Sequence, residues 1–282
     1  MTVTKLVQMK KEGKKIVALT AYDFLSARIL DQLGIDIIIV GDSVAQVLGY
    51  ENTLPVTIEE MLHHTKAVCR GNGSAVVVAD MPFMSYQVSV ADAVRNAGRF
   101  VKEAGAHAVK IEGGLERSET ITAILTAGIP VMSHIGIVPQ SYHRTGGYKV
   151  PGKNAEDAKR LLDEAIGLAN LGVFAIVLEC VPWKIAQVIS EHISIPTISI
   201  GSGVGCDGQV LVLHDILGMY EGKIPKHVKV YVQLVEEMKS AIKQYQLEVQ
   251  TSKFPTPTQS FEIDEPEFQK FLEIVHNPKS KI

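Results

Sequence analysis

The chain has 282 residues, of which 46% are hydrophobic and 21% are charged, and its formal net charge is −3. This composition favours a folded protein with a large core, and without a dense Lys/Arg block or an apolar run of ~20 residues we expect no nucleic-acid partner and no membrane span. No secretory segment opens the sequence, and the three cysteines are scattered without a CxxC pair, which predicts a soluble cytoplasmic protein.

Short apolar runs alternate along the chain with longer segments of helical periodicity. We expect strands at residues 15–20, 36–41, 75–80, 108–113, 130–134, 174–179, 196–201 and 208–213. Most of these runs are continuously apolar, as parallel strands covered on both faces require. Helical spacing is clearest at residues 57–71, 90–105, 116–130 and 155–172. Thr57 and Glu60 have the spacing of a capping box at the start of the first of these helices.

A strand followed by a helix about eight times predicts an α/β fold, a (β/α)8 TIM barrel, with residues 1–282 as one domain. The competing fold is a doubly wound open sheet, whose best support is GSGVGCDG at 201–208. That segment lacks the GxGxxG spacing of a dinucleotide-binding loop, so we favour the barrel. Residues 226–282 form an extension that we expect to cap the barrel or to meet a neighbouring subunit. Within it we expect a helix at 227–249, an extended linker at 251–261 and a short helix at 265–277.

Polar side chains follow several of the apolar runs. They are Asp42 and Ser43, then Asp80, Lys110, Glu112, Ser133, His134 and Glu179. In a barrel the carboxyl ends of the strands meet at one mouth, where active sites lie. Burying several carboxylates together is costly unless a cation neutralises them, and carboxylate oxygens are ligands that Mg²⁺ prefers. The sequence has no HExxH motif and no Cys/His pattern of zinc sites.

Two enzyme mechanisms fit these residues. Lys110 could form a Schiff base with a carbonyl substrate. Alternatively, a metal held by Asp42 and Asp80 polarises the carbonyl, a carboxylate removes the adjacent proton, and Lys110 anchors an anionic substrate. The number of carboxylates favours the metal mechanism. Taken singly, an Asp after a strand is often a helix N-cap, and we interpret Cys180, like His63 and His64, as a packing or surface residue.

Seven separated motifs together carry a family resemblance. They are VGDSV, TLPVTIEEMLHHT, ADMPFMSY, AGAHAVKIEGG, HIGIVPQSYHRTGGYKV, LECVP and DGQVLVLHD. Over residues 3–262 the chain resembles the ketopantoate hydroxymethyltransferases, (β/α)8 barrels of the phosphoenolpyruvate/pyruvate-binding superfamily. The resemblance implies transfer of a hydroxymethyl group from 5,10-methylenetetrahydrofolate to 3-methyl-2-oxobutanoate, giving ketopantoate for pantothenate and coenzyme A synthesis. It also implies one Mg²⁺ per subunit and a cytoplasmic homo-oligomer, commonly a decamer.

The resemblance also implies a role for each candidate residue. Asp42, Asp80 and Glu112 match the metal site, Glu179 matches the proton acceptor, and Asp42, Ser43, Asp80, Lys110 and His134 match residues that bind the oxo acid. It does not identify the residues that bind the folate. The alternatives are a Mg²⁺-dependent 2-oxo acid aldolase or lyase that uses a free aldehyde, and a catalytically silent barrel that binds a metabolite.

Overall fold

The computed structural model describes residues 1–147, 149–220, 222 and 224–276. The chain divides into two compact units, Met1–Tyr231 and Val232–Ile282. Each unit is described by itself below.

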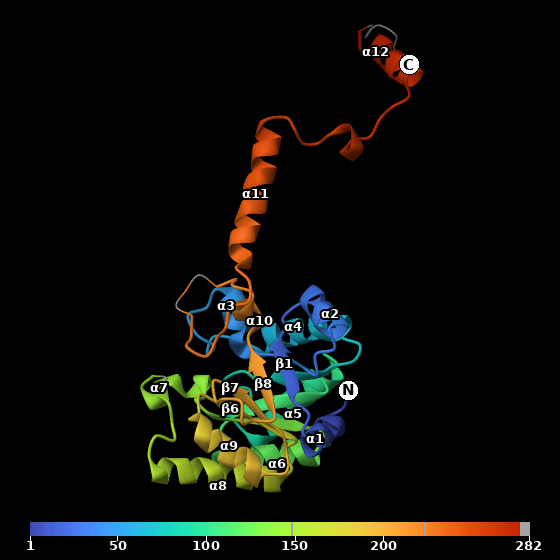
Figure 1. Cartoon of the computed structure of the whole chain (residues 1–282). Coiled ribbons are helices and arrows are strands. Elements are labelled where there is room, and N and C mark those ends of the chain that lie inside the picture. The colour runs from blue at the N-terminus through green and yellow to red at the C-terminus, as the bar shows by residue number, and fades with distance from the viewer. Residues whose placement is uncertain (148, 221, 223, 277–282) are drawn as a thin grey trace. The chain divides into compact units, whose positions relative to one another are not determined.

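The first unit is built on a closed barrel of parallel strands in chain order (Figure 1). The strands are β1 (Ile16–Thr20), β2 (Ile37–Val40), β3 (Val76–Asp80), β4 (Ala108–Glu112), β5 (Val131–Gly136), β6 (Ala175–Glu179), β7 (Thr197–Ile200) and β8 (Gly208–Leu211). The barrel closes where β1 pairs with β8, with Ile16 opposite Gly208. This confirms the predicted barrel and excludes the open sheet.

Helices connect the strands and surround the barrel. They are α1 (Val3–Lys11), α2 (Phe24–Gln32), α3 (Ala45–Leu48), α4 (Ile58–Gly71), α5 (Val90–Lys102), α6 (Ser118–Thr126), α7 (Tyr142–Thr145), α8 (Ala155–Leu171), α9 (Trp183–His192) and α10 (Leu213–Ile216). Short 3-10 turns occupy Asp42–Val44, Leu115–Arg117 and Pro139–Ser141. The predicted capping box begins α4: Glu60 N donates to Thr57 Oγ1 at 3.2 Å, and Thr57 N donates to the Glu60 carboxylate at 2.7 Å. These bonds satisfy amide groups that the helix itself leaves unpaired.

The alternation of strands and helices fails at one place. Residues 201–207, all of them described, join β7 to β8 through turns and contain no helix. Asp207 at the end of this connection accepts hydrogen bonds from Thr197 N and Lys10 Nζ, both at 2.8 Å. The glycine-rich segment is therefore a strand connection and not a dinucleotide-binding loop.

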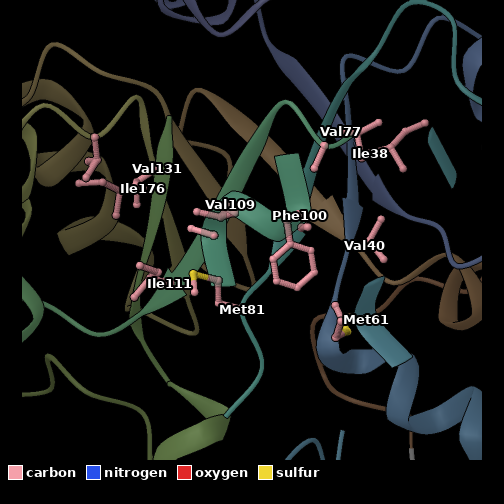
Figure 2. Packing of buried hydrophobic residues seen from close by; sticks show 14 of the residues in the cluster. Ile38, Val40, Met61, Val77, Met81, Phe100, Val109, Ile111, Val131 and Ile176 are labelled. Carbon is pink, nitrogen blue, oxygen red and sulfur yellow. The ribbon is translucent and has the colours of Figure 1, made fainter. Parts of the chain in front are cut away.

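Alternate residues of the strands pack on opposite sides of the barrel wall. Side chains facing the helices form the larger core, in which Ile38, Val77 and Val109 pack with Met61 of α4 and Phe100 of α5 (Figure 2). The inward side chains form a second core, made of Leu6, Met9, Ile16, Ile37, Ile39, Val76, Val78, Met132, Phe174, Val177 and Ile198 among others. Leu6 and Met9 come from α1, so this helix closes the end of the barrel where the strands begin (Figure 1). The interior is thus filled at that end, and polar side chains occupy the other.

The second unit contains α11 (Leu234–Gln250), a 3-10 turn at Pro257–Gln259 and α12 (Glu265–His276). The prediction of a helix from residue 227 is wrong at its start, since residues 227–233 are not helical. The β-branched and aromatic residues of VKVYV disfavour a helix there, and Tyr231 N donates instead to Ile216 O at 2.8 Å. The predicted final helix is confirmed to residue 276, and residue 277 lies outside the described residues. Every helix in the described part of the chain is too short or too polar to span a bilayer.

Candidate active site

Five polar side chains occupy inward positions at the carboxyl ends of four neighbouring strands. They are Asp80 of β3, Lys110 and Glu112 of β4, His134 of β5, and Glu179 of β6. Together with Asp42 and Ser43 they line one cavity of about 770 Å³. The structure therefore brings together all seven residues proposed from the sequence. Ser133, on the outward side of β5, does not line this cavity and donates to Gly113 O at 3.1 Å.

Asp42, Asp80 and Lys110 form the deepest contacts of the site. Asp80 Oδ2 accepts hydrogen bonds from Lys110 Nζ at 2.7 Å and from Asp42 N at 3.2 Å. Gly41 makes this approach possible, because a Cβ on it would lie 2.7 Å from Ser43 Oγ and 3.5 Å from Asp80 Oδ2. Asp80 Oδ1 is buried and has no hydrogen-bond partner among the described residues. This oxygen is left for a ligand.

Gln140 links the two carboxylates on either side of the site. Its Nε2 donates to Asp42 Oδ2 and to Met81 O, both at 3.0 Å, and its backbone N donates to Glu112 Oε2 at 2.9 Å. Tyr86 donates to Gln140 Oε1 at 2.7 Å and so fixes the orientation of the amide. Gln140 received no role from the sequence. The only available signal was its place in HIGIVPQ, directly after β5.

His134 lies between two carboxylates. Its Nε2 is 3.2 Å from Glu179 Oε2, and its Nδ1 is 3.8 Å from Glu112 Oε1. The Glu179 side chain is 18% exposed, whereas the side chains of Asp80 and Glu112 are only 5% and 4% exposed. Glu179 is therefore the carboxylate that a molecule in the cavity reaches most easily.

Negative charge outweighs positive charge in this cluster. Burial, and then the charge of Asp80, raises the pKa of Asp42 to about 6. Burial, and then the charge of Asp42, raises the pKa of Glu112 well above its usual value. Burial acts to lower the pKa of Lys110, but Asp80, Glu112 and Asp42 together raise it, so its ammonium stays charged. The cluster thus lacks the positive charge that would balance its carboxylates.

A divalent cation fits this donor set. Asp80 Oδ1 is unpartnered, and burial first, followed by the charge of a neighbouring carboxylate, raises the pKa of Asp42 and of Glu112. Among the described residues no three His, Cys, Asp or Glu side chains group into a complete metal cage. Such a cage is not needed for Mg²⁺, which commonly keeps several waters and takes only one or two carboxylates from the protein.

Ser43 is oriented by a residue that sequence reasoning missed. Tyr22 Oη and Ser43 Oγ are 2.8 Å apart, and the Tyr22 ring lies 5.4 Å from that of His214. His64 Nδ1 donates to Tyr22 O at 2.7 Å, which gives His64 a structural contact and leaves it outside the cavity. His63 is exposed on α4. Both histidines therefore have the packing or surface positions that we expected.

Comparison with known proteins identifies close relatives. Residues 1–257 match the family described as Ketopantoate hydroxymethyltransferase. The chain is 57% identical over 261 residues to the 3-methyl-2-oxobutanoate hydroxymethyltransferase of Carboxydothermus hydrogenoformans, covering 92% of this chain and 95% of the relative. It is 56% identical over 265 residues to the enzyme of that name from Clostridium botulinum strain Loch Maree, covering 94% and 96%.

Solved structures with the same fold are more distant in sequence. The phosphoenolpyruvate phosphomutase of Streptomyces platensis superposes with a TM-score of 0.60 at 15% identity, covering 99% of both chains. A 2,3-dimethylmalate lyase of the PEP mutase/isocitrate lyase superfamily gives a TM-score of 0.55 at 14% identity, covering 98% of this chain and 96% of the lyase. At these identities the likeness concerns the fold alone, the (β/α)8 barrel expected from the sequence.

Proposed function

Since the chain belongs to the ketopantoate hydroxymethyltransferase family, it is a transferase of pantothenate biosynthesis, and we propose that it works with Mg²⁺ and 5,10-methylenetetrahydrofolate. The observation that carries this proposal is the excess of negative charge in the buried cluster, where several carboxylates surround the one ammonium group of Lys110. Asp42 and Asp80 are the proposed metal ligands. Glu112 completes the proposed site through a water molecule. When bound, the cation would withdraw electron density from the keto oxygen of the oxo acid.

Lys110 and Ser43 are the proposed anchors of the oxo acid. Lys110 Nζ is held by Asp80 at 2.7 Å and keeps its charge, which suits a salt bridge with the substrate carboxylate. The same raised pKa disfavours a Schiff base, because a nucleophilic lysine has to lose its proton first. Tyr22 holds the Ser43 hydroxyl in the cavity wall.

Glu179 is the proposed base that removes the C3 proton of 3-methyl-2-oxobutanoate. It follows the apolar strand β6 and is the most accessible of the carboxylates contributed by the strands. His134 Nε2 lies 3.2 Å from Glu179 Oε2, although neither ring nitrogen makes a hydrogen bond among the described residues. His134 is therefore close enough to receive the proton from Glu179. Removal of the C3 proton gives a carbon nucleophile, which then attacks the one-carbon unit.

The decisive test is formation of ketopantoate from the oxo acid and 5,10-methylenetetrahydrofolate. We expect turnover with Mg²⁺, loss with EDTA and recovery when Mg²⁺ is restored. Turnover only with free formaldehyde would support an aldehyde-dependent aldolase instead, and ligand binding without any turnover would support a silent metabolite-binding barrel.

A homo-oligomer is the proposed assembly, with a decamer as the specific expectation. The helices of the second unit support association, since α11 exposes Met238, Ile242 and Tyr245, and α12 exposes Phe271 and Ile274. Apolar side chains at helical spacing favour burial against another surface. Light scattering coupled to size-exclusion chromatography measures the subunit number.

Three free cysteines agree with the proposed cytoplasmic location.

A further inference from the structure

The cavity is larger than a small oxo acid needs. Its volume of about 770 Å³ lies within the ~300–1,000 Å³ of sites for drug-sized ligands. Its lining includes the carboxylates and Lys110. It also includes more exposed side chains, among them Tyr50, Tyr220, Lys226 and His227. Aromatic rings and basic groups suit a flat, nitrogen-rich and anionic molecule, and none of these residues has a role in binding the oxo acid.

His227 is held beside the residue that follows Glu179. Its Nδ1 lies 3.8 Å from Cys180 Sγ. Burial, and then the charge of Glu179, raises the pKa of the Cys180 thiol to about 11, so the sulfur stays a neutral thiol and can accept a weak hydrogen bond from Nδ1–H. Nε2 is then the ring nitrogen left for a ligand, and in the imidazolium form it carries a proton.

The backbone around this pair is shaped to bring the two residues together. Cys180 has a φ of +53°, which is uncommon for a residue with a side chain. Gly201 leaves room for both, because a Cβ there would lie 3.0 Å from His227 Cβ and 3.3 Å from Cys180 Sγ. Val228 N donates to Pro225 O at 3.0 Å, which fixes the turn that carries His227.

Asp215 and Lys226 lie near His227. The His227 charge acts to lower the pKa of the Asp215 carboxyl, although burial, the larger effect, raises it. Asp215 Oδ1 has no hydrogen-bond partner among the described residues. Lys226 is exposed, so its ammonium is solvated.

The proposed reaction requires proton donors near the one-carbon unit. Both C–N bonds of the methylene carbon break, one C–C bond forms to C3, and one C–O bond forms to the oxygen of water. The electron pairs of the broken bonds go to the two nitrogens. Of the three hydrogens released by C3 and water, two end on these nitrogens and one on the new hydroxyl. An amine leaves readily only when its nitrogen is protonated.

We infer that the one-carbon donor binds against the exposed side chains of this cavity and that His227, as an imidazolium, transfers its Nε2 proton to the departing amine nitrogen and takes a proton back from the water that the reaction consumes. This inference rests on the proposed function. Glu179 serves the oxo acid, whereas His227 serves the donor, so the two residues act on different halves of the reaction.

The test compares the full-length protein with its His227→Gln variant in two assays. The first is turnover with 5,10-methylenetetrahydrofolate, and the second is exchange of the C3 proton with solvent in the absence of donor. We expect kcat with the folate to fall about 100-fold, as is usual when a general acid is lost, while C3 exchange stays within about threefold. His63→Gln, on the exposed face of α4, is the matched control and should change neither rate.

Each other outcome overturns the inference. A His227→Gln variant with unchanged folate-dependent kcat removes His227 as the proton donor. Loss of C3 exchange along with turnover shows that His227 does not act on the donor half alone, which overturns the inference. If the wild-type protein exchanges the C3 proton but makes no product with the folate, the proposed function fails for its donor, and the inference fails with it.

Discussion

Gln140 Nε2 donates a 3.0 Å hydrogen bond to Asp42 Oδ2 across 98 residues of sequence. The same side chain, with its backbone N on Glu112, holds two carboxylates that repel each other. Gln140 thus fixes the orientation of the proposed metal ligands without a bound cation, as outer-shell residues do in known metal sites.

We predict that Gln140→Ala lowers the affinity for Mg²⁺ about 10–100-fold, the usual effect of losing an outer-shell partner. The variant also leaves Met81 O and Asp42 Oδ2 without their donor, which should lower the free energy of unfolding by about 1–3 kcal/mol. Activity titrated against Mg²⁺, together with thermal unfolding, measures both effects. Gln87→Ala is the control, since Gln87 donates to Gln140 Oε1 at 3.2 Å and accepts from Tyr86 N at 3.3 Å, but forms no hydrogen bond with either carboxylate among the described residues. An equal Mg²⁺ concentration for half-maximal activity in the two variants would contradict the prediction.

We predict that Asp42→Asn stabilises the metal-free protein at pH 7 while abolishing turnover. The folded-state pKa of Asp42, about 6, lies above its ordinary value of 3.8. The stability linked to protonated Asp42 is therefore present at low pH and is lost as the pH rises through about 6. Asparagine avoids this loss, worth about 1–3 kcal/mol.

The measurement for Asp42→Asn is the melting temperature with EDTA from pH 4 to 8. The variant should melt several degrees above the wild type at pH 7 and approach it at pH 4, where Asp42 is protonated in the folded state and about half protonated in the unfolded state. A variant that is less stable at pH 7 would refute the raised pKa.

We predict that Gly41→Ala damages the site more than the fold. The new methyl group would lie 2.7 Å from Ser43 Oγ, so the serine side chain has to move out of the cavity wall. We expect KM for the oxo acid to rise at least about tenfold, a loss of about 1.4 kcal/mol of binding. Gly98→Ala on α5 is the control: nothing lies within 4 Å of its Cβ, and in a helix it should stabilise by about 0.5–1 kcal/mol. An unchanged KM in Gly41→Ala would remove Ser43 from the substrate site.

Tyr22→Phe tests the same serine more gently. The substitution removes one hydroxyl 2.8 Å from Ser43 Oγ and keeps the ring packed beside His214. We expect a three- to tenfold rise in KM for the oxo acid with little change in kcat, because about 1 kcal/mol of hydrogen bonding is lost. Steady-state kinetics with saturating folate separates the two constants. A fall in kcat alone would argue that Tyr22 acts on the chemical step.

The sequence predicted the barrel and the convergence of its polar residues for a simple reason. Both depend on local pattern: continuous apolar runs mark buried parallel strands, and the residues at their carboxyl ends must meet at one mouth. The missed residues depend on distant contacts. His227, in the turn at 225–228, lines the cavity. Gln140, after β5, and Tyr22, after β1, contact the lining residues Asp42 and Ser43, and no local pattern marks these contacts. The predicted helix began too early because the apolar residues of VKVYV fitted a helical pattern. Their low helix propensity was given too little weight.

The closure of the barrel by α1 bears on the order of events during turnover. With Leu6 and Met9 packed into the interior, reactants have to enter and leave at the carboxyl end of the strands. The residues assigned to the oxo acid are the more buried ones of the cavity. A donor bound against the exposed side chains would therefore block entry and exit of the oxo acid. The kinetics should therefore follow a compulsory sequence: oxo acid first, then donor, with the spent donor released before the hydroxymethylated acid. Product-inhibition patterns report such a sequence directly.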